Sequence, residues 1–278
     1  MRKRKIIDKI VQSLIYSCGI VICIVLIAIF IYVVVQGITS LNLNFFIRLP
    51  KPVGEKGGGM ANAIIGSFML VGLASLWAVP LSILIGIYLS EFSGQVKESK
   101  FATFLRFLLD VLNGVPSIVI GIFAYSMLVK PMKTFSAIAG AFALGLIMIP
   151  TVARTTEEML RMVPRSIREA SLALGINRWK TTLYVVLNTA KPGVLTGVLL
   201  ATARIFGETA PLLFTAFGNR WWARSLTEPI AALPLQIFVY AISPYEDWHK
   251  QAWAGSLVLI LIVFSIILIS RKILLKYK

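Results

Sequence analysis

Two residues of opposite charge, Arg204 and Glu208, stand inside an otherwise apolar stretch, GVLTGVLLATARIFGETAPLLFTAF. Four positions separate them, so on a helix they share one face and can reach each other. Ionisable groups at membrane depth are rare and usually face a cavity or the interior of a helix bundle. The pair either neutralises itself and holds helix packing, or forms an anion site. In that site the Arg204 fork would bind an oxyanion, and Glu208 would keep binding weak enough for release.

Gly207 and Pro211 bracket the residues that follow this pair, within the segment RIFGETAP. Both residue types allow a helix to deform and to turn backbone groups toward a cavity. Thr209 is the remaining polar side chain of the segment. We place Thr209 with Arg204 and Glu208 among the expected pathway residues.

A second candidate stretch is NGVPSIVIG at residues 113–121. Pro116 could break a helix there and Ser117 could offer a hydroxyl group, although a simple kinked helix explains both residues equally well. Arg154 is a weaker candidate for a second positively charged site along the anion pathway. It could also be an anchor at the cytoplasmic end of a span.

The composition requires these residues to lie in a membrane protein. The 278 residues are 58% hydrophobic and only 14% charged, against roughly 25% charged in soluble domains. We expect an all-α polytopic protein, because several apolar runs reach the roughly 20 residues that cross a bilayer. The six predicted spans cover residues 14–36, 62–90, 109–129, 135–156, 193–217 and 252–270.

The net charge of +16 comes from Lys and Arg that cluster at the ends of the apolar runs, which indicates topology rather than nucleic-acid binding. The side with more of these residues should be cytoplasmic. It holds both termini and the charged loop at 157–188. The predicted organisation is a basic N-terminus at 1–13, an uncleaved signal anchor at 14–36, an external loop at 37–61, a core at 62–270 and a basic tail at 271–278.

The external connections also carry signals. Residues 37–61 contain KPVGEKGGG, which predicts a flexible loop. Residues 218–251 are rich in Trp and Tyr, which settle at the headgroup level, so a short interfacial helix is expected there.

The charged loop has the pattern of a short helix followed by a tight turn. Pro164 suits its first turn, Gly175 suits the left-handed position just past its end, and Asn177 can cap the next helix. Four residues fall on one small, mildly apolar face at helical spacing: Ile167, Ala170, Ser171 and Leu174. Such a face could insert into a groove on a partner, or the loop could lie on the membrane as an amphipathic segment.

This loop resembles the EAA loop of ABC importer permeases. Glu169, Ala170 and Ser171 are followed by Gly175 at the family's spacing. The resemblance implies a MetI-like type I importer permease fold, with the helix from Ile167 to Gly175 inserted into a cleft on an ATP-binding subunit.

The chain departs from the EAA pattern at two positions. Ser171 replaces the second Ala, which exchanges one small residue for another. Asn188 stands where the pattern has Pro, so Pro192 is expected to supply the break that enters the fifth span.

The segments RIFGETAP and NGVPS and the tail from residue 225 onward are similar to permeases of phosphate importers, and more to the PstA type than to the PstC type. The resemblance implies inorganic phosphate as cargo and movement by alternating access. It also implies a heterodimer with a PstC-like permease, two PstB-like ATPase subunits and an external PstS-like binding protein. Other cargoes, such as molybdate, sulfate, phosphonate or an amino acid, stay open, as does a channel or scaffold without an ATPase.

Several other chemistries find no residues to support them. The sequence has no GxxxxGK[ST] phosphate loop, so ATP and Mg²⁺ would be used by the partner ATPase, and this chain is expected to bind no cofactor and to catalyse no reaction. Cys18 and Cys23 lie in the first apolar run and His249 stands apart from both, so no metal site is expected.

Overall fold

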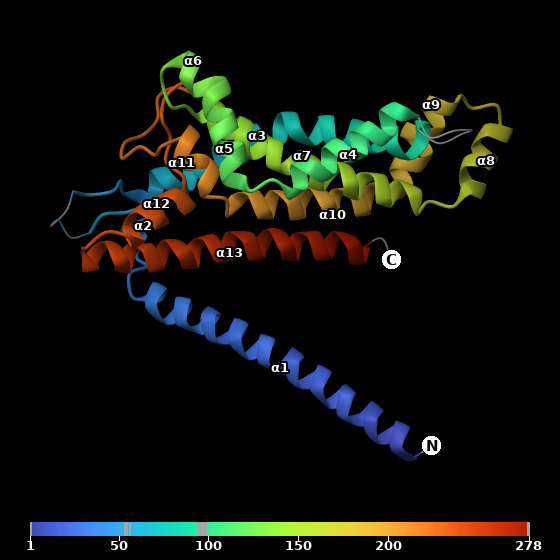
Figure 1. Cartoon of the computed structure of the whole chain (residues 1–278). Helices are drawn as coiled ribbons and strands as arrows, with labels where there is room; N and C mark the ends of the chain where they lie inside the picture. The colour runs from blue at the N-terminus through green and yellow to red at the C-terminus, as the bar shows by residue number, and fades with distance from the viewer. Residues whose placement is uncertain (1, 53–54, 56, 94–98, 277–278) are drawn as a thin grey trace.

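The computed structural model describes residues 2–52, 55, 57–93 and 99–276, and the regular secondary structure of these residues is helical apart from one bridge between Phe217 and Ile230. Five helical segments are long and apolar enough to cross a membrane. The helices that form them, drawn in Figure 1, are α1 (Arg2–Ile38), α3 (Ala61–Ile87), α7 (Ala137–Arg161), α10 (Leu187–Phe206) and α13 (Glu246–Lys276). The chain is therefore a multi-spanning membrane protein.

Helices α3 and α7 run in the same direction and form the centre of the bundle. Glycines on one helix lie opposite larger side chains on the other: Gly86 meets Thr156, and Gly145 meets the Trp77 ring. Small residues let membrane helices approach closely. Helix α10 packs on α7 in the same way but in the opposite direction, so α7 has close neighbours on two sides.

The predicted span at 109–129 is not one straight helix. Helix α4 (Lys100–Gly114) ends there, and α5 (Ser117–Ala124), η2 (Tyr125–Val129) and α6 (Lys130–Met132) continue at a bend of 104°. Pro116 has no N–H to continue the helix and disfavours helical geometry at the residue before it. Val115 accordingly adopts an extended conformation. The bent pair therefore makes a sixth span only if its two halves cross the membrane together; otherwise it forms a re-entrant loop.

The predicted span at 193–217 is also interrupted. The spanning segment begins earlier, at Arg178, and ends at Phe206. Gly207 closes α10, and the chain turns into the short helix α11 (Ala210–Thr215), which has Pro211 in its first turn. The break expected at Pro192 is absent, because α10 runs through that residue.

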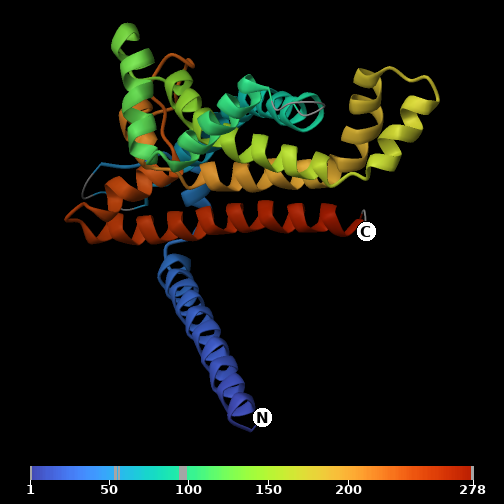
Figure 2. The same ribbon diagram turned by 45° about the vertical axis from the view of Figure 1, so that its right-hand side comes forward.

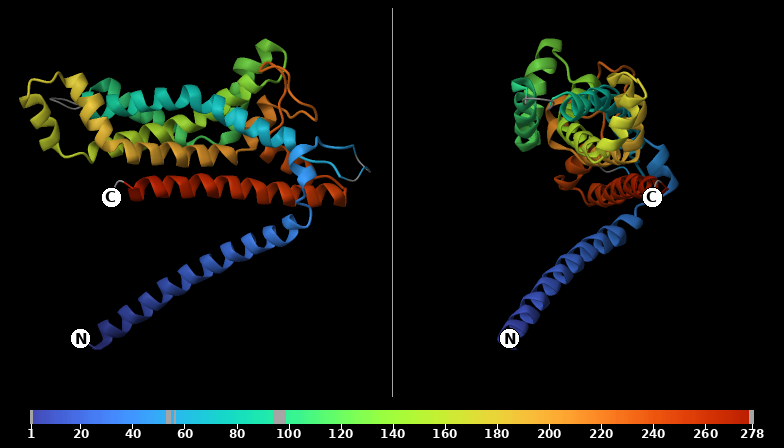
Figure 3. Two further views of the ribbon diagram at one scale, coloured as in Figure 1. Left: turned by 180° about the vertical axis from the view of Figure 1, so that it is seen from behind. Right: turned by 90° about the vertical axis from the view of Figure 1, so that its right-hand side faces the viewer.

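The two ends of the bundle differ. The start of α1, the described end of α13 and the helix α8 (Arg165–Ala173) lie at one end, as Figures 1 and 3 show. At the other end lie α2 (Leu43–Ile47), with Phe45 buried against the core, and α12 (Leu233–Ala241). Part of the loop expected to be flexible is therefore helical, while residues 53, 54 and 56 lie outside the described residues. Helix α12 supplies the short helix expected between residues 218 and 251.

Helix α1 leaves the rest of the bundle (Figure 2). The last turns of α1 contact the first part of α13, where Gly37 touches Trp253 and Leu257. Most of the length of α1 is exposed.

Candidate functional site

The end of α10 brings Arg204 and Glu208 together. The distance from Arg204 Nε to Glu208 Oε1 is 3.9 Å, which is too long for a hydrogen bond. The Arg204 side chain is 50% exposed and the Glu208 side chain 17%. Because Glu208 makes no hydrogen bond with Arg204, the N–H groups of the guanidinium remain available to another acceptor. This arrangement suits an anion site better than a hydrogen-bonded structural ion pair.

A pocket of about 160 Å³ joins this pair to the second candidate motif. Its lining combines the bend between α4 and α5 with the end of α10 and one residue of α7: Leu112, Asn113, Val115, Pro116, Ser117, Ile120, Ile147, Arg204 and Glu208. The two stretches that were singled out separately therefore form one site. Asn113 and Ile147 also line it, and neither was predicted to do so.

The crossing of α5 and α11 holds the two motifs against each other. A Cβ atom on Gly121 would lie 2.7 Å from Cα of Pro211, closer than real Cβ contacts. The last residue of NGVPSIVIG therefore packs directly on RIFGETAP. This contact sets the distance between the bend at Pro116 and the end of α10.

The start of α5 adds partial positive charge to the pocket. Pro116 precedes the helix, Ser117 begins it, and both residues line the pocket, so the N-terminal end of the helix dipole lies beside it. Helix N-termini and Arg both favour anions, and Glu208 offsets part of this charge.

The site lies deep in the bundle. Gly193 packs on Met159 near the end of the bundle that carries α8, and the rise of α10 from Gly193 to Arg204 is about 17 Å. The hydrocarbon core of a bilayer is about 30 Å thick, so a bilayer whose inner boundary meets α10 near Gly193 would have Arg204 near its middle.

Two predicted pathway residues lie outside the pocket lining. Thr209 occupies the position before α11 and contributes its backbone carbonyl to that helix. Arg154, on α7, forms an ion pair with Asp110 of α4, a partner that the sequence analysis missed. The structure thus brings Arg204, Glu208, Pro116 and Ser117 together but leaves Arg154 in a separate pair.

The charged loop forms a helical hairpin that projects from one end of the bundle (Figure 2). Helix α8 ends in a Schellman turn: the Gly175 N–H donates to Leu172 O at 2.9 Å and the Ile176 N–H to Ser171 O at 3.4 Å. Gly175 has φ +79°, the left-handed conformation predicted for it. The second arm consists of α9 (Arg178–Lys180) and η3 (Thr181–Val186).

Two details of the predicted hairpin differ. Pro164 precedes the first turn of α8 instead of lying in it. Asn177 stands before α9, but its side chain makes no capping hydrogen bond.

The face predicted for docking is divided. Ser171 is buried, with its Oγ 2.9 Å from Thr181 Oγ1 on the other arm, and Ile167 packs against the end of α7. Leu174 is 80% exposed, and Glu169 and Ala170 are exposed as well. Ser171 and Ile167 therefore hold the hairpin together, and the surface left for a partner is built around Leu174 and Ala170.

Comparison with known proteins assigns these features to a family. Residues 78–277 match the sequence model of the binding-protein-dependent transport system inner membrane component. The chain belongs to this family. It is accordingly a transport component that spans the membrane several times.

Its relatives include proteins named PstA. The chain is 44% identical over 268 residues to the phosphate transport system permease protein PstA of Haemophilus influenzae, an alignment that covers 96% of this chain and 94% of the relative. It is 38% identical to the probable phosphate transport system permease protein PstA of Methanocaldococcus jannaschii, over 95% of this chain and 92% of the relative. The chain is thus a PstA-type permease by sequence.

Solved structures share the fold. A chain of the bacterial alginate ABC transporter superposes with a TM-score of 0.62 over 95% of this chain and 93% of its own length, at 12% identity. A chain of the inward-facing MetNI methionine ABC transporter gives 0.60 over 78% and 93%, at 17% identity. These likenesses support the predicted importer-permease fold.

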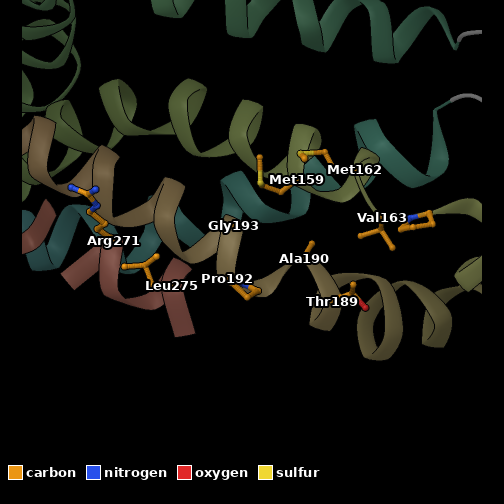
Figure 4. Close-up of a pocket in the computed structure, with 10 residues that line it drawn as sticks. Met159, Met162, Val163, Thr189, Ala190, Pro192, Gly193, Arg271 and Leu275 are labelled. Atoms are coloured by element: carbon orange, nitrogen blue, oxygen red, sulfur yellow. The ribbon is translucent and has the colours of Figure 1, made fainter. Parts of the chain in front are cut away.

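A larger hollow of about 580 Å³ lies elsewhere in this permease, at the end of the bundle that carries the hairpin (Figure 4). Its walls are the end of α7, the start of α10 and the last turns of α13, with mostly apolar side chains. Neither Arg204 nor Ser117 reaches it, so it is separate from the pocket at Arg204.

Proposed function

We propose that this chain is the permease subunit of an ATP-driven ABC importer that carries inorganic phosphate into the cell by alternating access. One observation carries the proposal: Arg204, loosely paired with Glu208, lines the same pocket as the N-terminus of α5. The similarity to proteins named PstA supports phosphate as the cargo.

The chain would work as part of a larger assembly. A second, PstC-like permease would complete the pathway as a heterodimer, and an external PstS-like protein would deliver phosphate. Two PstB-like subunits would bind ATP and Mg²⁺ and dock on the exposed part of the hairpin. Both termini and the hairpin would then face the cytoplasm, as the distribution of Lys and Arg indicates.

The mechanism needs no covalent chemistry on this chain. Phosphate would enter the pocket as an anion and accept hydrogen bonds from the Arg204 fork and from N–H groups at the start of α5. Glu208 would lower the affinity so that the anion leaves when the pathway opens inward. Closure of the ATPase pair would move the hairpin and reorient the helices around the pocket.

Phosphate uptake by membrane vesicles that contain the whole assembly tests this proposal. Arg204→Gln should reduce uptake at least about tenfold while the ATPase subunit still co-purifies, because Gln stays polar but loses the positive charge and the planar guanidinium group. Arg48→Gln, an identical change on an exposed residue outside the pocket, is the matched control and should retain uptake.

Full uptake by Arg204→Gln would show that Arg204 is structural and would move the anion site to the partner permease. If the wild type carries molybdate, sulfate or phosphonate but not phosphate, the architecture holds and the cargo assignment falls. Absence of any stable complex with an ATP-binding subunit would favour a channel or scaffold.

A further inference from the structure

Glu91 connects the hairpin to the end of α3. This residue lies in η1 (Tyr88–Phe92), a wide π-helical turn that directly follows α3. Arg168 of α8 donates hydrogen bonds to both carboxylate oxygens of Glu91, with Nε 3.0 Å from Oε2 and Nη2 2.6 Å from Oε1. The Glu91 side chain is 8% exposed and that of Arg168 19%. A two-point contact of this kind holds orientation as well as distance.

The same guanidinium also binds the end of α7. Arg168 Nη1 donates to Val163 O at 2.5 Å and Nη2 donates to Leu160 O at 2.6 Å. Carbonyl groups at a helix end have no partner within the helix, so a cation there satisfies them. Arg168 therefore joins α8, the end of α7 and η1 at a single point.

The second arm of the hairpin holds the same turn. Arg178 donates to the backbone carbonyl of Glu91, and its guanidinium carbon lies 5.2 Å from the centre of the Phe92 ring. The hydrogen bond between Ser171 and Thr181 joins the two arms. Both arms are thus fixed to η1 and to each other.

On one side, the base of the hairpin borders an open hollow. The hollow of about 580 Å³ lies there, between Met159 and Val163 at the end of α7 and Pro192 in α10 (Figure 4). A packed contact resists displacement, whereas a void lets the base of the hairpin shift. Movement of the hairpin would therefore reach α3 through Glu91, while the second arm of the hairpin continues directly into α10.

A rigid route leads from η1 to the anion pocket. Helix α3 packs along α7 through close contacts such as Gly86 on Thr156, and Ile147 of α7 lines the pocket. We propose that Glu91 is the positioning residue that transmits displacement of the hairpin to α3 and α7, so that ATP hydrolysis by the partner opens the anion pocket. This inference rests on the proposed function, because it assumes that an ATPase docks on the hairpin.

The experiment compares transport with hydrolysis in proteoliposomes that contain the complete assembly and the external binding protein. Two quantities are measured: the phosphate taken up per ATP hydrolysed, and the stimulation of hydrolysis by the loaded binding protein. Glu91→Gln and Arg168→Gln should each lower both at least about fivefold in the assembled complex. The double variant should be no worse than Arg168→Gln alone, because Arg168→Gln already breaks the contact with Glu91. Arg168→Lys, which keeps the charge, should restore part of the loss.

The matched control is Glu157→Gln. Glu157 is also a buried acid, 5% exposed at its side chain, and it pairs with Arg106 and Arg161. Arg106 also donates to Leu89 O of η1, so Glu157→Gln weakens a neighbouring contact of η1 but leaves the contact between Glu91 and the hairpin intact. Glu157→Gln can lower the yield of the assembly, but assembled complexes should show wild-type uptake per ATP. If Glu91→Gln prevents assembly, Arg178→Gln is the milder variant, and it should also lower the ratio.

Normal coupling in assembled Glu91→Gln or Arg178→Gln complexes would overturn the proposal and reduce the contact to a stabilising ion pair. The same conclusion would follow if Glu157→Gln uncoupled the complex equally. A wild type that hydrolyses ATP but takes up no phosphate would refute the cargo assignment alone, since stimulation of hydrolysis still reports on Glu91.

Discussion

Gly121 shows how a single residue controls the geometry of the anion pocket. Its hydrogen atom faces Pro211, and a Cβ atom there would lie 2.7 Å from the Pro211 backbone. Gly121→Leu should therefore separate α5 from α11, at a cost of about 1–3 kcal/mol, and displace Ser117 from Arg204. We expect the phosphate concentration for half-maximal uptake to rise several-fold in vesicles. Gly72→Leu, at a glycine with open space around it, is the control and should behave like the wild type. If Gly121→Leu leaves the phosphate concentration for half-maximal uptake unchanged, the crossing of α5 and α11 does not determine the geometry of the site.

The interactions of individual residues were the least predictable part of the site. Arg204 and Glu208 could be paired from the sequence because a helix fixes the spacing of residues four apart. Glu91 could not be assigned to Arg168, because 77 positions separate them and only the packing of α3 beside α7 brings them together. Arg154 was considered as a lone cation for the same reason, since its partner Asp110 lies on another helix.

At the scale of elements, the turn of the hairpin depends on backbone conformation alone. Gly175 has φ +79°, and a Cβ atom there would meet no other atom within 4 Å. Gly175→Val should therefore cost about 1–2 kcal/mol through the left-handed backbone and not through a clash. The loosened hairpin should lower phosphate uptake per ATP severalfold. Gly175→Asn is the control, because Asn tolerates the left-handed conformation, and it should retain coupling. If both variants lose phosphate uptake per ATP equally, the added side chain obstructs the docking partner instead.

The helices themselves were largely predictable, and their breaks were only partly so. Long apolar runs locate α1, α3, α7 and α13, because each must cover about 30 Å of hydrocarbon. Pro116 and Gly207 were recognised as places where a helix can deform. The size of the bend, 104° between α4 and the helices after it, follows from the packing of α5 against α11, which local sequence does not encode.

At the scale of the whole molecule, the arrangement of the termini and the hairpin predicts how the permease lies in the membrane. The start of α1, the described end of α13 and the hairpin share one end (Figure 3), and Lys and Arg are concentrated in the segments at that end. Cytoplasmic loops carry the excess of these residues, so this end should face the cytoplasm. The opposite end carries α12 and Trp221, which is 73% exposed.

Labelling with a membrane-impermeant maleimide tests this orientation. Cys18 and Cys23 are first replaced by Ser, and one cysteine is then introduced, in cells that lack the ATPase subunit. Trp221→Cys should react in intact cells, whereas Leu174→Cys, at the exposed tip of the hairpin, should react only after permeabilisation. Because the hairpin can meet a cytoplasmic ATPase only from the inside, reaction of Leu174→Cys in intact cells would refute both the orientation and the role of the hairpin in coupling.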